Sequence, residues 1–422
     1  MSSTFSRQRA VAAAVVGNVL EWYDFAVYTY LAGTIALRFF PRDDAGSALL
    51  ATFMAYGFGF VARPLGGIVL GRLGDTRGRR VALLVTIFMM AGGTVMIGLL
   101  PTFDSIGLAA PLLLVVARLV QGFSAGGDWG TSTAYIVEWA PPDRRGFYAS
   151  FQQASVAAGL LLGSGLAALL NTLISPEAMA AWGWRVPFLL GGLLGPVGLF
   201  MRRTVEETPL FEASRAQPPS VTTSETARWR LGGRAFGFTI VWTVSYYVLL
   251  MYMPTWSGQY LHLSASAALW SNTLGLLLLL VAIPGMGLLS DHVGRKPLLL
   301  ACCVAFLVVP YPVFRYLTAD GAASFERLLL VQLFFALLIS TFSGPGPAAI
   351  AEIFPTRYRS AWLTAGYALS VSIFGGFAPF ISVWLIEHLG SPTVHTFYLM
   401  AAAAVSTVVI AAMPETAFRD LS

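Results

Sequence analysis

A charged, glycine-rich stretch, GRLGDTRGRR (residues 71–80), separates two long apolar runs and constrains this chain more than any other feature. The runs, residues 47–70 and 81–100, are each long enough to cross a bilayer, which takes about 20 residues as a helix. The stretch between them is therefore expected to be a short loop at a membrane surface. Its arginines predict that this surface is cytoplasmic, because positive charge beside a span is retained on that side.

The charged stretch has a second copy, GLLSDHVGRK (residues 287–296). Asp291 stands for Asp75 in this copy, and Arg295 stands for Arg79. A membrane chain with an internal repeat of this kind is typical of transporters, in which two equivalent bundles rock about a site between them. The repeat thus predicts two halves of about six spans each.

A second landmark repeats at nearly the same distance. EWAPPDRRG begins at Glu138 and contains Arg145, and EIFPTRYRS begins at Glu352 and contains Arg359. Basic loops that only set the topology would explain these arginines. They would not explain the repeated Asp, Gly and Glu, so we favour duplicated gating loops.

The composition supports a membrane protein. Of 422 residues, 56% are hydrophobic and 11% charged, and the mean hydropathy is +0.71. A soluble domain carries about 25–35% charged residues on its surface, so we predict an all-α membrane protein. The net charge of +5 reflects topology rather than a nucleic-acid partner, because most basic residues fall in loops expected to be cytoplasmic.

Twelve transmembrane helices in two pseudo-symmetric six-helix bundles are predicted. The expected spans are 10–38, 47–71, 81–101, 108–138, 147–171, 184–203, 233–258, 265–290, 297–317, 327–352, 360–388 and 393–413. Residues 1–203 form the N-terminal bundle, residues 233–422 form the C-terminal bundle, and the polar, Pro/Ser/Thr-rich residues 204–232 form a cytoplasmic linker. An even number of spans places both termini in the cytoplasm.

Charged residues inside the spans predict the substrate or proton site, because an ionisable group at the bilayer centre costs about 2.5 to 3.5 kcal/mol on insertion scales. Glu21 and Asp24 share one face of the first span with Asn18 and Tyr28. The fourth span has a second polar stripe, made up of Arg118, Gln121, Asp128, Ser132 and Tyr135. The two stripes are expected to face one hydrated cavity. The fifth span adds Gln152 to them.

The second half has almost no charge in its spans. Tyr246 in the seventh span and Asn272 in the eighth predict a polar, hydrogen-bonding wall opposite the charged one. STFSGPGP (340–347) and GGFAP (375–379) are expected to break the tenth and eleventh spans, since proline interrupts helical hydrogen bonding. Aromatic interface anchors and lipid-facing kinks remain the alternative interpretation.

Other interpretations of the charged residues stay open. Glu21 or Asp24 can pair with Arg63 or Arg118 as a structural tie that never contacts substrate. Glu138 and Glu352, beside arginines at span ends, are better explained as gating pairs than as transport carboxylates. Neither the histidines nor the adjacent Cys302 and Cys303 have the spacing of metal ligands, and no enzymatic motif is found, so we expect no metal, no cofactor and no enzyme.

The two copies of the charged loop resemble the loop signature of the major facilitator superfamily. RLVQGFSAG (118–126) resembles that superfamily's fourth-span motif. More narrowly, four segments are similar to the metabolite:proton symporter family, which includes citrate, 2-oxoglutarate, shikimate and proline/betaine carriers. They are GNVLEWYDFAVYTYLA (17–32), RPLGGIVLGRLGD (63–75), QGFSAGGDWG (121–130) and WGWRVPFLLG (182–191).

The resemblance implies alternating access driven by the proton gradient. The loops would lock the cytoplasmic side through a gating set of ten residues: Gly71, Asp75, Arg79, Arg80, Glu138, Arg145, Asp291, Arg295, Glu352 and Arg359. Glu21, Asp24 or Asp128 would take up the proton, and Arg118 would answer the negative charge of the substrate or of a deprotonated acid.

Within that family, the chain is most similar to citrate carriers in GFYASFQQAS (146–155) and FGGFAPFIS (374–382). We therefore expect import of a small organic anion such as citrate together with protons, in the cytoplasmic (inner) membrane. The alternatives are a symporter of a zwitterionic osmolyte and a proton-coupled exporter. The lipid bilayer is the other expected partner, nucleic acid is not one, and a monomer is expected to suffice.

Overall fold

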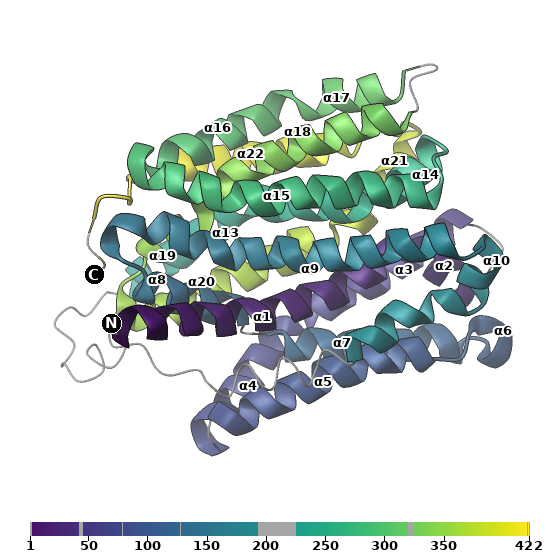
Figure 1. Ribbon diagram of the computed structural model, residues 1–422, viewed down its shortest axis with the longest axis horizontal. Helices are drawn as coiled ribbons and strands as arrows, with labels where there is room; N and C mark the ends of the chain where they lie inside the picture. The colour runs from purple at the N-terminus through teal and green to yellow at the C-terminus, as the bar shows by residue number, and fades with distance from the viewer. Residues whose placement is uncertain are drawn as a thin grey trace.

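Helices form all the regular secondary structure in the part of the chain that the structure describes. The computed structural model describes residues 2–41, 45–77, 79–126, 128–192, 225–319, 324–419 and 421. The helices run roughly parallel to one another, and both termini lie at the same end of the bundle (Figure 1). This arrangement agrees with an even number of spans.

The first half of the chain contains long helices with several breaks. Its α-helices are α1 (Ser2–Tyr30), α2 (Ala32–Phe39), α3 (Ala45–Val61), α4 (Arg63–Arg77), α5 (Arg79–Leu99), α6 (Phe103–Ile106), α7 (Ala109–Ser124), α8 (Asp128–Trp139), α9 (Arg145–Leu173) and α10 (Pro176–Ala178). The short helical turn η1 (Pro142–Arg144) precedes α9, and a second one, η2 (Met179–Gly183), follows α10. Residues 185–192 are also helical.

The second half repeats this pattern. Its helices are α13 (Glu225–Ser245), α14 (Met253–Tyr260), α15 (Ala265–Val293), α16 (Arg295–Val308), α17 (Pro310–Leu317), α18 (Phe325–Ser343), α19 (Gly346–Glu352), α20 (Thr356–Ser370), α21 (Ala378–Leu389) and α22 (Thr396–Ala411). Two π-helical turns, η3 (Tyr246–Tyr252) and η4 (Val371–Gly375), join α13 to α14 and α20 to α21.

Each of the twelve predicted spans is helical along most of its described length. By length and apolar composition alone, six helices of the described residues could cross a membrane, or seven if α16 and α17 count as one span bent by 50°. Several of the remaining spans are broken into shorter helices. The predicted linker begins outside the described residues, and its last residues, 225–232, belong to α13.

The breaks in the tenth and eleventh spans are confirmed. α18 ends at Ser343 and α19 begins at Gly346, and α21 begins after η4 with proline near its first position. The fourth span was predicted as one helix, and that detail is wrong. It divides into α7 and α8 beside Gly126, where an added Cβ would collide with the backbone of α4.

Close helix contacts depend on glycine. A Cβ on Gly122 of α7 would collide with the carbonyl of Gly59 on α3, so only glycine permits the two backbones to approach this closely. Arg118 lies one turn before Gly122 on α7, at the same contact with α3, and its side chain is buried there. Glycine thus positions the one arginine that lies mid-span in α7.

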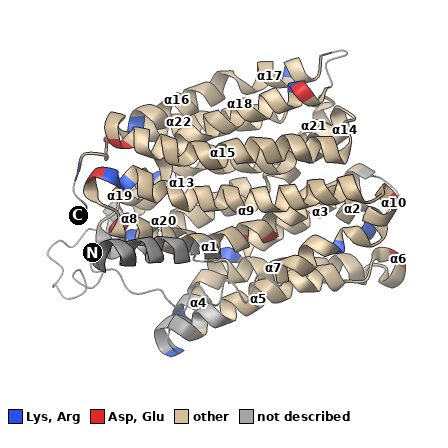
Figure 2. Ribbon diagram, in the orientation of Figure 1, with Lys and Arg blue, Asp and Glu red and all other residues tan. Residues whose placement is uncertain are grey.

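α9 and α15 lie side by side through the middle of the molecule (Figure 1). They join the two halves, because Ser164 of α9 lies 2.9 Å from the Thr273 hydroxyl of α15. Figure 2 shows charged residues at both ends of the bundle, and several of them lie at the end where the termini lie. We call this end, which contains Arg145, Arg295 and Arg359, the basic end.

Candidate functional site

A chain of hydrogen bonds joins a buried carboxylate to a buried guanidinium inside the first half. Thr94 Oγ1 of α5 donates to Asp24 Oδ2 of α1 at 2.8 Å, and accepts from Gln121 Nε2 of α7 at 2.6 Å. Gln121 Oε1 accepts from Arg118 Nη1 at 2.8 Å. All four side chains are buried. We call these four residues the Asp24–Arg118 chain.

Both ends of the Asp24–Arg118 chain have polar atoms with no hydrogen-bond partner among the described residues. These atoms are Oδ1 of Asp24 and Nε and Nη2 of Arg118, and all are buried. A buried polar atom without a partner costs about 1–3 kcal/mol, more when it is charged. Such atoms persist where a ligand, a proton or a change of conformation satisfies them in another state.

Aromatic rings surround the arginine end. The guanidinium carbon of Arg118 lies 3.6 Å from the centroid of the Tyr28 ring and 5.8 Å from that of Tyr56. The faces of these rings stabilise the cation, and this attraction is stronger when the cation and the rings are buried. The structure therefore brings Asp24, Tyr28, Arg118 and Gln121 together, as the two polar stripes predicted; what they bind remains a prediction.

Glu21 belongs to a second charged centre. Its Oε1 lies 3.4 Å from Nη2 of Arg63, and both side chains are buried. The Arg63 guanidinium lies over the rings of Phe25 and Phe60, at 4.6 and 4.3 Å from their centroids. The pairing of Glu21 with Arg63 that the sequence left open is thus found, and it separates Glu21 from the Asp24–Arg118 chain.

Gln152 of α9 is part of a third polar cluster. Asn18 Nδ2 donates to Gln152 Oε1 at 3.0 Å and to Ser155 Oγ at 2.7 Å. Gln152 Nε2 donates to Ser132 Oγ of α8 at 3.0 Å. This cluster ties α1 to α8 and α9. The side chain of Asp128 lies outside the described residues.

Tyr246 and Asn272 lie in the second half, and their hydrogen bonds are to residues outside the Asp24–Arg118 chain. The hydroxyl of Tyr246 lies 3.1 Å from that of Ser343, at the break between α18 and α19. Asn272 Nδ2 donates to Ser164 of α9 at 3.2 Å, so it contacts the first half. Whether they face substrate remains a prediction.

Aromatic packing closes the centre of the molecule between the halves. The ring of Tyr247 in η3 packs against Trp22, Tyr56 and Phe60, with centroids 5.5–6.3 Å apart. Tyr30 donates to the Leu250 carbonyl at 3.0 Å. These contacts cross from α1 and α3 to η3, so they must break if the halves separate there.

The basic end is closed by ion pairs and by a helix N-terminus. The carboxylate of Asp291 accepts from the backbone N–H groups of Gly146 and Phe147, at 2.8 and 2.9 Å, in the first turn of α9. Arg295 Nη1 donates to the same carboxylate at 2.7 Å. A carboxylate is stabilised at a helix N-terminus by free N–H groups and by the helix dipole. Asp291 therefore links α15 to the first half.

Two further contacts cross the halves at this end. Arg359 Nη1 lies 3.1 Å from Oε1 of Glu138, and Arg145 Nη1 lies 3.7 Å from Oε1 of Glu352. Arg295 also approaches Glu352, at 3.3 Å. Of the other gating residues, the surroundings of Gly71, Asp75, Arg79 and Arg80 lie outside what the structure describes. The segment around them is mostly helical rather than a loop, since α4 continues to Arg77 and α5 begins at Arg79.

Glu415 adds a contact that the sequence did not predict. Its carboxylate accepts from the backbone N–H groups of Arg295 and Lys296, at 2.9 and 3.0 Å, at the start of α16. The segment after α22 is thereby tied to α16 beside Gly294, whose φ of +96° favours glycine. Arg145 reaches the same segment through the carbonyl of Arg419 at 2.8 Å.

The Glu415 contact predicts a pH dependence of stability. Burial raises the pKa of this carboxyl, but hydrogen bonds from the N–H groups of Ala417, Arg295, Lys296 and Thr416 outweigh burial and hold the pKa below its usual 4.5. A depressed pKa in the folded state adds stability above the unfolded pKa, and that stability is lost as pH falls through the folded pKa. Thermal unfolding in detergent should show wild type more stable than Glu415→Gln at neutral pH. The difference should shrink below pH 4.5, whereas a difference independent of pH would refute the hydrogen-bond account.

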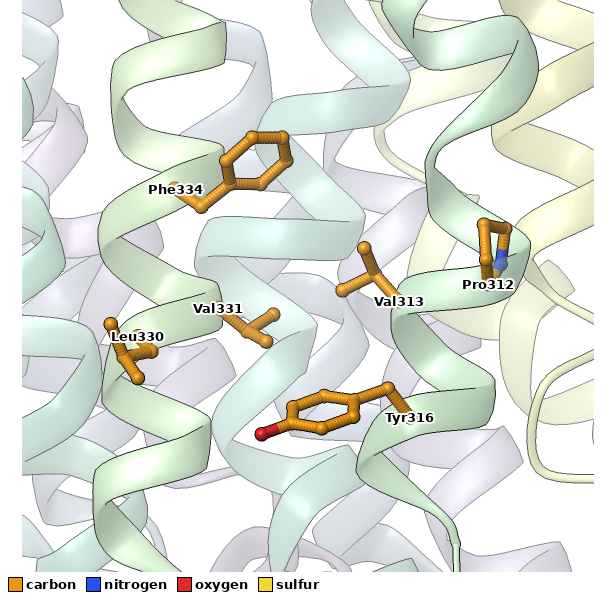
Figure 3. Close-up of a pocket in the computed structure, with 6 residues that line it drawn as sticks. All are labelled: Pro312, Val313, Tyr316, Leu330, Val331 and Phe334. Carbon is orange, nitrogen blue, oxygen red and sulfur yellow. The ribbon is translucent and has the colours of Figure 1, made fainter.

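A pocket on the second half lies apart from these groups. It is formed between α17 and α18 and lined by apolar atoms and one tyrosine ring (Figure 3). The lining residues are Pro312, Val313, Tyr316, Leu330, Val331 and Phe334. None of the predicted site residues lines it, so it does not bear on the charged centres.

Comparison with known proteins gives matches over the whole chain. The family model described as "Sugar (and other) transporter" matches residues 10–229 and again residues 225–422. The glycine betaine/proline/ectoine/pipecolic acid transporter OusA of Dickeya dadantii is 35% identical over 98% of this chain and 84% of its own length. The citrate-proton symporter of Klebsiella pneumoniae is 37% identical over 94% of this chain and 90% of its own.

A solved structure confirms the fold prediction. The proton:xylose symporter XylE, of the major facilitator superfamily, superposes with a TM-score of 0.76 at 19% sequence identity, covering 98% of this chain and 97% of that one. The identity is low, so this likeness concerns the fold alone. The all-α, twelve-helix membrane fold predicted from the spans and the repeat is therefore confirmed.

Proposed function

Because this chain belongs to the sugar (and other) transporter family of the major facilitator superfamily, we propose that it is a proton-coupled symporter that imports a small organic acid. The protein is a multi-pass membrane transporter and not an enzyme. The observation that carries the proposal is the buried Asp24–Arg118 chain, in which a carboxylate oxygen at one end and guanidinium N–H groups at the other have no hydrogen-bond partner within the described part of the chain.

The two ends suit two different cargoes. A carboxylate in a low-dielectric site binds a proton at a modest cost, because burial disfavours its charged form. A guanidinium presents N–H donors in a fork that matches a carboxylate in a bidentate manner. We infer that Asp24 takes the proton and that Arg118 recognises the negative group of the substrate.

A citrate-like di- or tricarboxylate is the substrate that we propose to test first. The relatives divide: one is named for citrate and another for betaine, proline, ectoine and pipecolic acid. Both sets of compounds carry a carboxylate, so the recognition that we assign to Arg118 applies to both. A zwitterionic osmolyte is therefore the second candidate.

The closed contacts indicate how transport would proceed. The two halves, residues 1–203 and 233–422 joined by 204–232, would separate alternately at the basic end and at the opposite end. The ion pairs of Arg145 with Glu352 and of Arg359 with Glu138 cross the halves and hold the basic end closed. We propose that this end faces the cytoplasm, with both termini there and the carrier in the inner membrane, because basic loops are retained inside.

Uptake into proteoliposomes tests the proposal. Labelled citrate, 2-oxoglutarate, shikimate and glycine betaine are offered one at a time with an imposed pH gradient, the interior alkaline. We expect one of them to accumulate only while the gradient lasts. Asp24→Asn should abolish this accumulation but leave exchange of labelled for unlabelled substrate, because the site remains and only the titrating group is lost.

The outcome that contradicts the proposal is equally concrete. If no carboxylate accumulates and a preloaded amphipathic cation leaves when the exterior is acidified, the protein is an exporter and Arg118 does not recognise an anion. If accumulation is unchanged in Asp24→Asn, Asp24 is not the residue that takes up the proton, although the protein is still a symporter.

A further inference from the structure

The threonine in the Asp24–Arg118 chain has two acceptors for its single hydroxyl proton. Thr94 Oγ1 lies 2.8 Å from Asp24 Oδ2 and 3.0 Å from the backbone carbonyl of Met90, one turn earlier in α5. One hydroxyl hydrogen serves only one of these acceptors at a time. The same oxygen accepts from Gln121 Nε2 at 2.6 Å. Thr94 therefore has two alternative hydrogen-bonding states within a fixed geometry.

The charge on Asp24 selects between the two states. An ionised carboxylate only accepts, so the Thr94 hydroxyl donates to it, and all three bonds of the chain then point from the Arg118 cation to the Asp24 anion. A protonated Asp24 donates its own hydrogen to Thr94 Oγ1, and the hydroxyl of Thr94 turns to the Met90 carbonyl. In that state the chain no longer ends on a negative charge.

Arg118 experiences this difference without touching Asp24. Its guanidinium contacts Gln121 and the rings of Tyr28 and Tyr56, and its Nε and Nη2 groups have no hydrogen-bond partner among the residues that the structure describes. Hydrogen bonds aligned between opposite charges strengthen one another in a low-dielectric interior. When Asp24 is neutral, the aligned hydrogen bonds stabilise the Arg118 cation less. Arg118 then binds an anion more favourably.

The side of Asp24 that bears its free oxygen lies within the first half. A Cβ added to Gly191, in the helical residues 185–192, would lie 2.7 Å from Asp24 Oδ1, so glycine lets this helix pack against that buried oxygen without a clash. Among the described residues, the titratable groups around Asp24 are Tyr23 on the same helix, which donates to the Pro187 carbonyl, and Arg118 on α7. The proton site is thus set apart from the aromatic contact between the halves.

We propose that Thr94 and Gln121 are positioning residues that transmit the protonation of Asp24 to Arg118, so that proton and substrate couple through two neutral side chains rather than through a direct ion pair. This inference rests on the proposed function, because it assigns the coupling step within the same site. No covalent change is involved: the proton moves onto Asp24, the Thr94 hydroxyl rotates, and Arg118 gains an anionic partner.

The test separates coupling from transport. Thr94→Val keeps the shape of the side chain and removes the hydroxyl, Thr94→Ser keeps the hydroxyl, and Thr133→Val is the matched control. The Thr133 hydroxyl is equally buried but donates to the Trp129 carbonyl in its own helix. Each variant is reconstituted, and exchange of the labelled probes, citrate and glycine betaine, is compared with their gradient-driven accumulation.

We expect accumulation in Thr94→Val to fall at least about tenfold relative to exchange. A tenfold fall is what a tenfold change in the proton-binding constant of Asp24 would produce. Thr94→Ser should restore accumulation and Thr133→Val should leave it intact. Gradient-driven accumulation of wild-type size in Thr94→Val overturns the proposal. So does an equal fall of exchange and accumulation, because that indicates a structural role.

A second measurement needs no substrate. The infrared difference spectrum between acidic and alkaline buffer reports the carbonyl stretch of the protonated Asp24 carboxyl, identified by its loss in Asp24→Asn. We expect this band to shift in Thr94→Val, because the carboxyl loses its partner, and to stay unmoved in Thr133→Val. If the band does not shift in Thr94→Val, Thr94 does not transmit the protonation of Asp24, even if transport changes. If wild type exchanges neither probe while the band shifts as expected, the proposed substrate class fails and the hydrogen-bond chain stands.

Discussion

Replacing Arg118 with alanine should abolish both exchange and accumulation of substrate. The guanidinium is fully buried on α7, and it is the cation at the end of the hydrogen-bond chain from Asp24. Loss of a hydrogen bond to a charged group costs about 1.5–3 kcal/mol, or roughly a tenfold to hundredfold loss of affinity, and a bidentate contact loses two. The measurement is exchange of labelled substrate across proteoliposomes at saturating and limiting concentrations.

Arg118→Lys makes this prediction more specific. Lysine keeps the positive charge but lacks the planar fork, so it cannot hold Gln121 and a carboxylate in the same geometry. We expect exchange to require far higher substrate concentrations than in wild type. The matched control is Arg38→Ala, which removes an arginine that donates to the Ala180 carbonyl outside the charged centres. Full transport by Arg118→Lys would argue against bidentate recognition, and full transport by Arg118→Ala would remove Arg118 from the site.

Replacing Asp291 with asparagine should open the basic end. The carboxylate accepts from two backbone N–H groups of α9 and from Arg295 of its own half, so the neutral amide weakens two charge-assisted contacts across the halves and the ion pair that holds the carboxylate in place. At about 1.5–3 kcal/mol for each such contact, the closed population should fall by roughly tenfold or more. Transport should fall with it, because alternating access needs both closed forms.

Cysteine labelling measures this opening. In a protein with Cys302 and Cys303 replaced by alanine, Ser150→Cys places a thiol on α9 where it is buried against Gly287 of α15. Asp291→Asn should make this thiol react faster with a maleimide. Ser164→Cys on the same helix, where the hydroxyl contacts Thr273, is the control and should not react faster. Equal gains at both positions would indicate unfolding rather than opening, and no gain at Ser150→Cys would show that Asp291 does not hold the gate.

Much of the fold could be predicted because it follows from strong local signals. Apolar runs of membrane length, separated by charged loops, determine where helices lie, and the repeat of Asp291 and Arg295 predicts two halves. The helix breaks at Pro345 and near Pro379 follow from proline itself. The break of the fourth span beside Gly126 was not predicted, since glycine inside an apolar run is common in membrane helices and becomes a break only through its contact with α4.

The candidate site was partly predictable for a related reason. Asp24 and Arg118 stand out in the sequence because charge is rare inside a span. Thr94 and Gly191 do not stand out: a threonine or a glycine in an apolar helix is ordinary, and its role depends on which helix packs beside it. The assignment of Glu21 to Arg63 rather than to the Asp24–Arg118 chain likewise depends on packing among α1, α4 and α7.

The direction of proton movement tests the central claim most directly. Proteoliposomes that hold a pH-sensitive dye, with no gradient imposed, receive citrate or glycine betaine from outside. Symport predicts that one of these substrates acidifies the interior, and that Asp24→Asn abolishes this acidification while exchange persists. Alkalinisation of the interior on adding a transported compound would show antiport instead, and would contradict the account of Asp24 and Arg118 as partners in import.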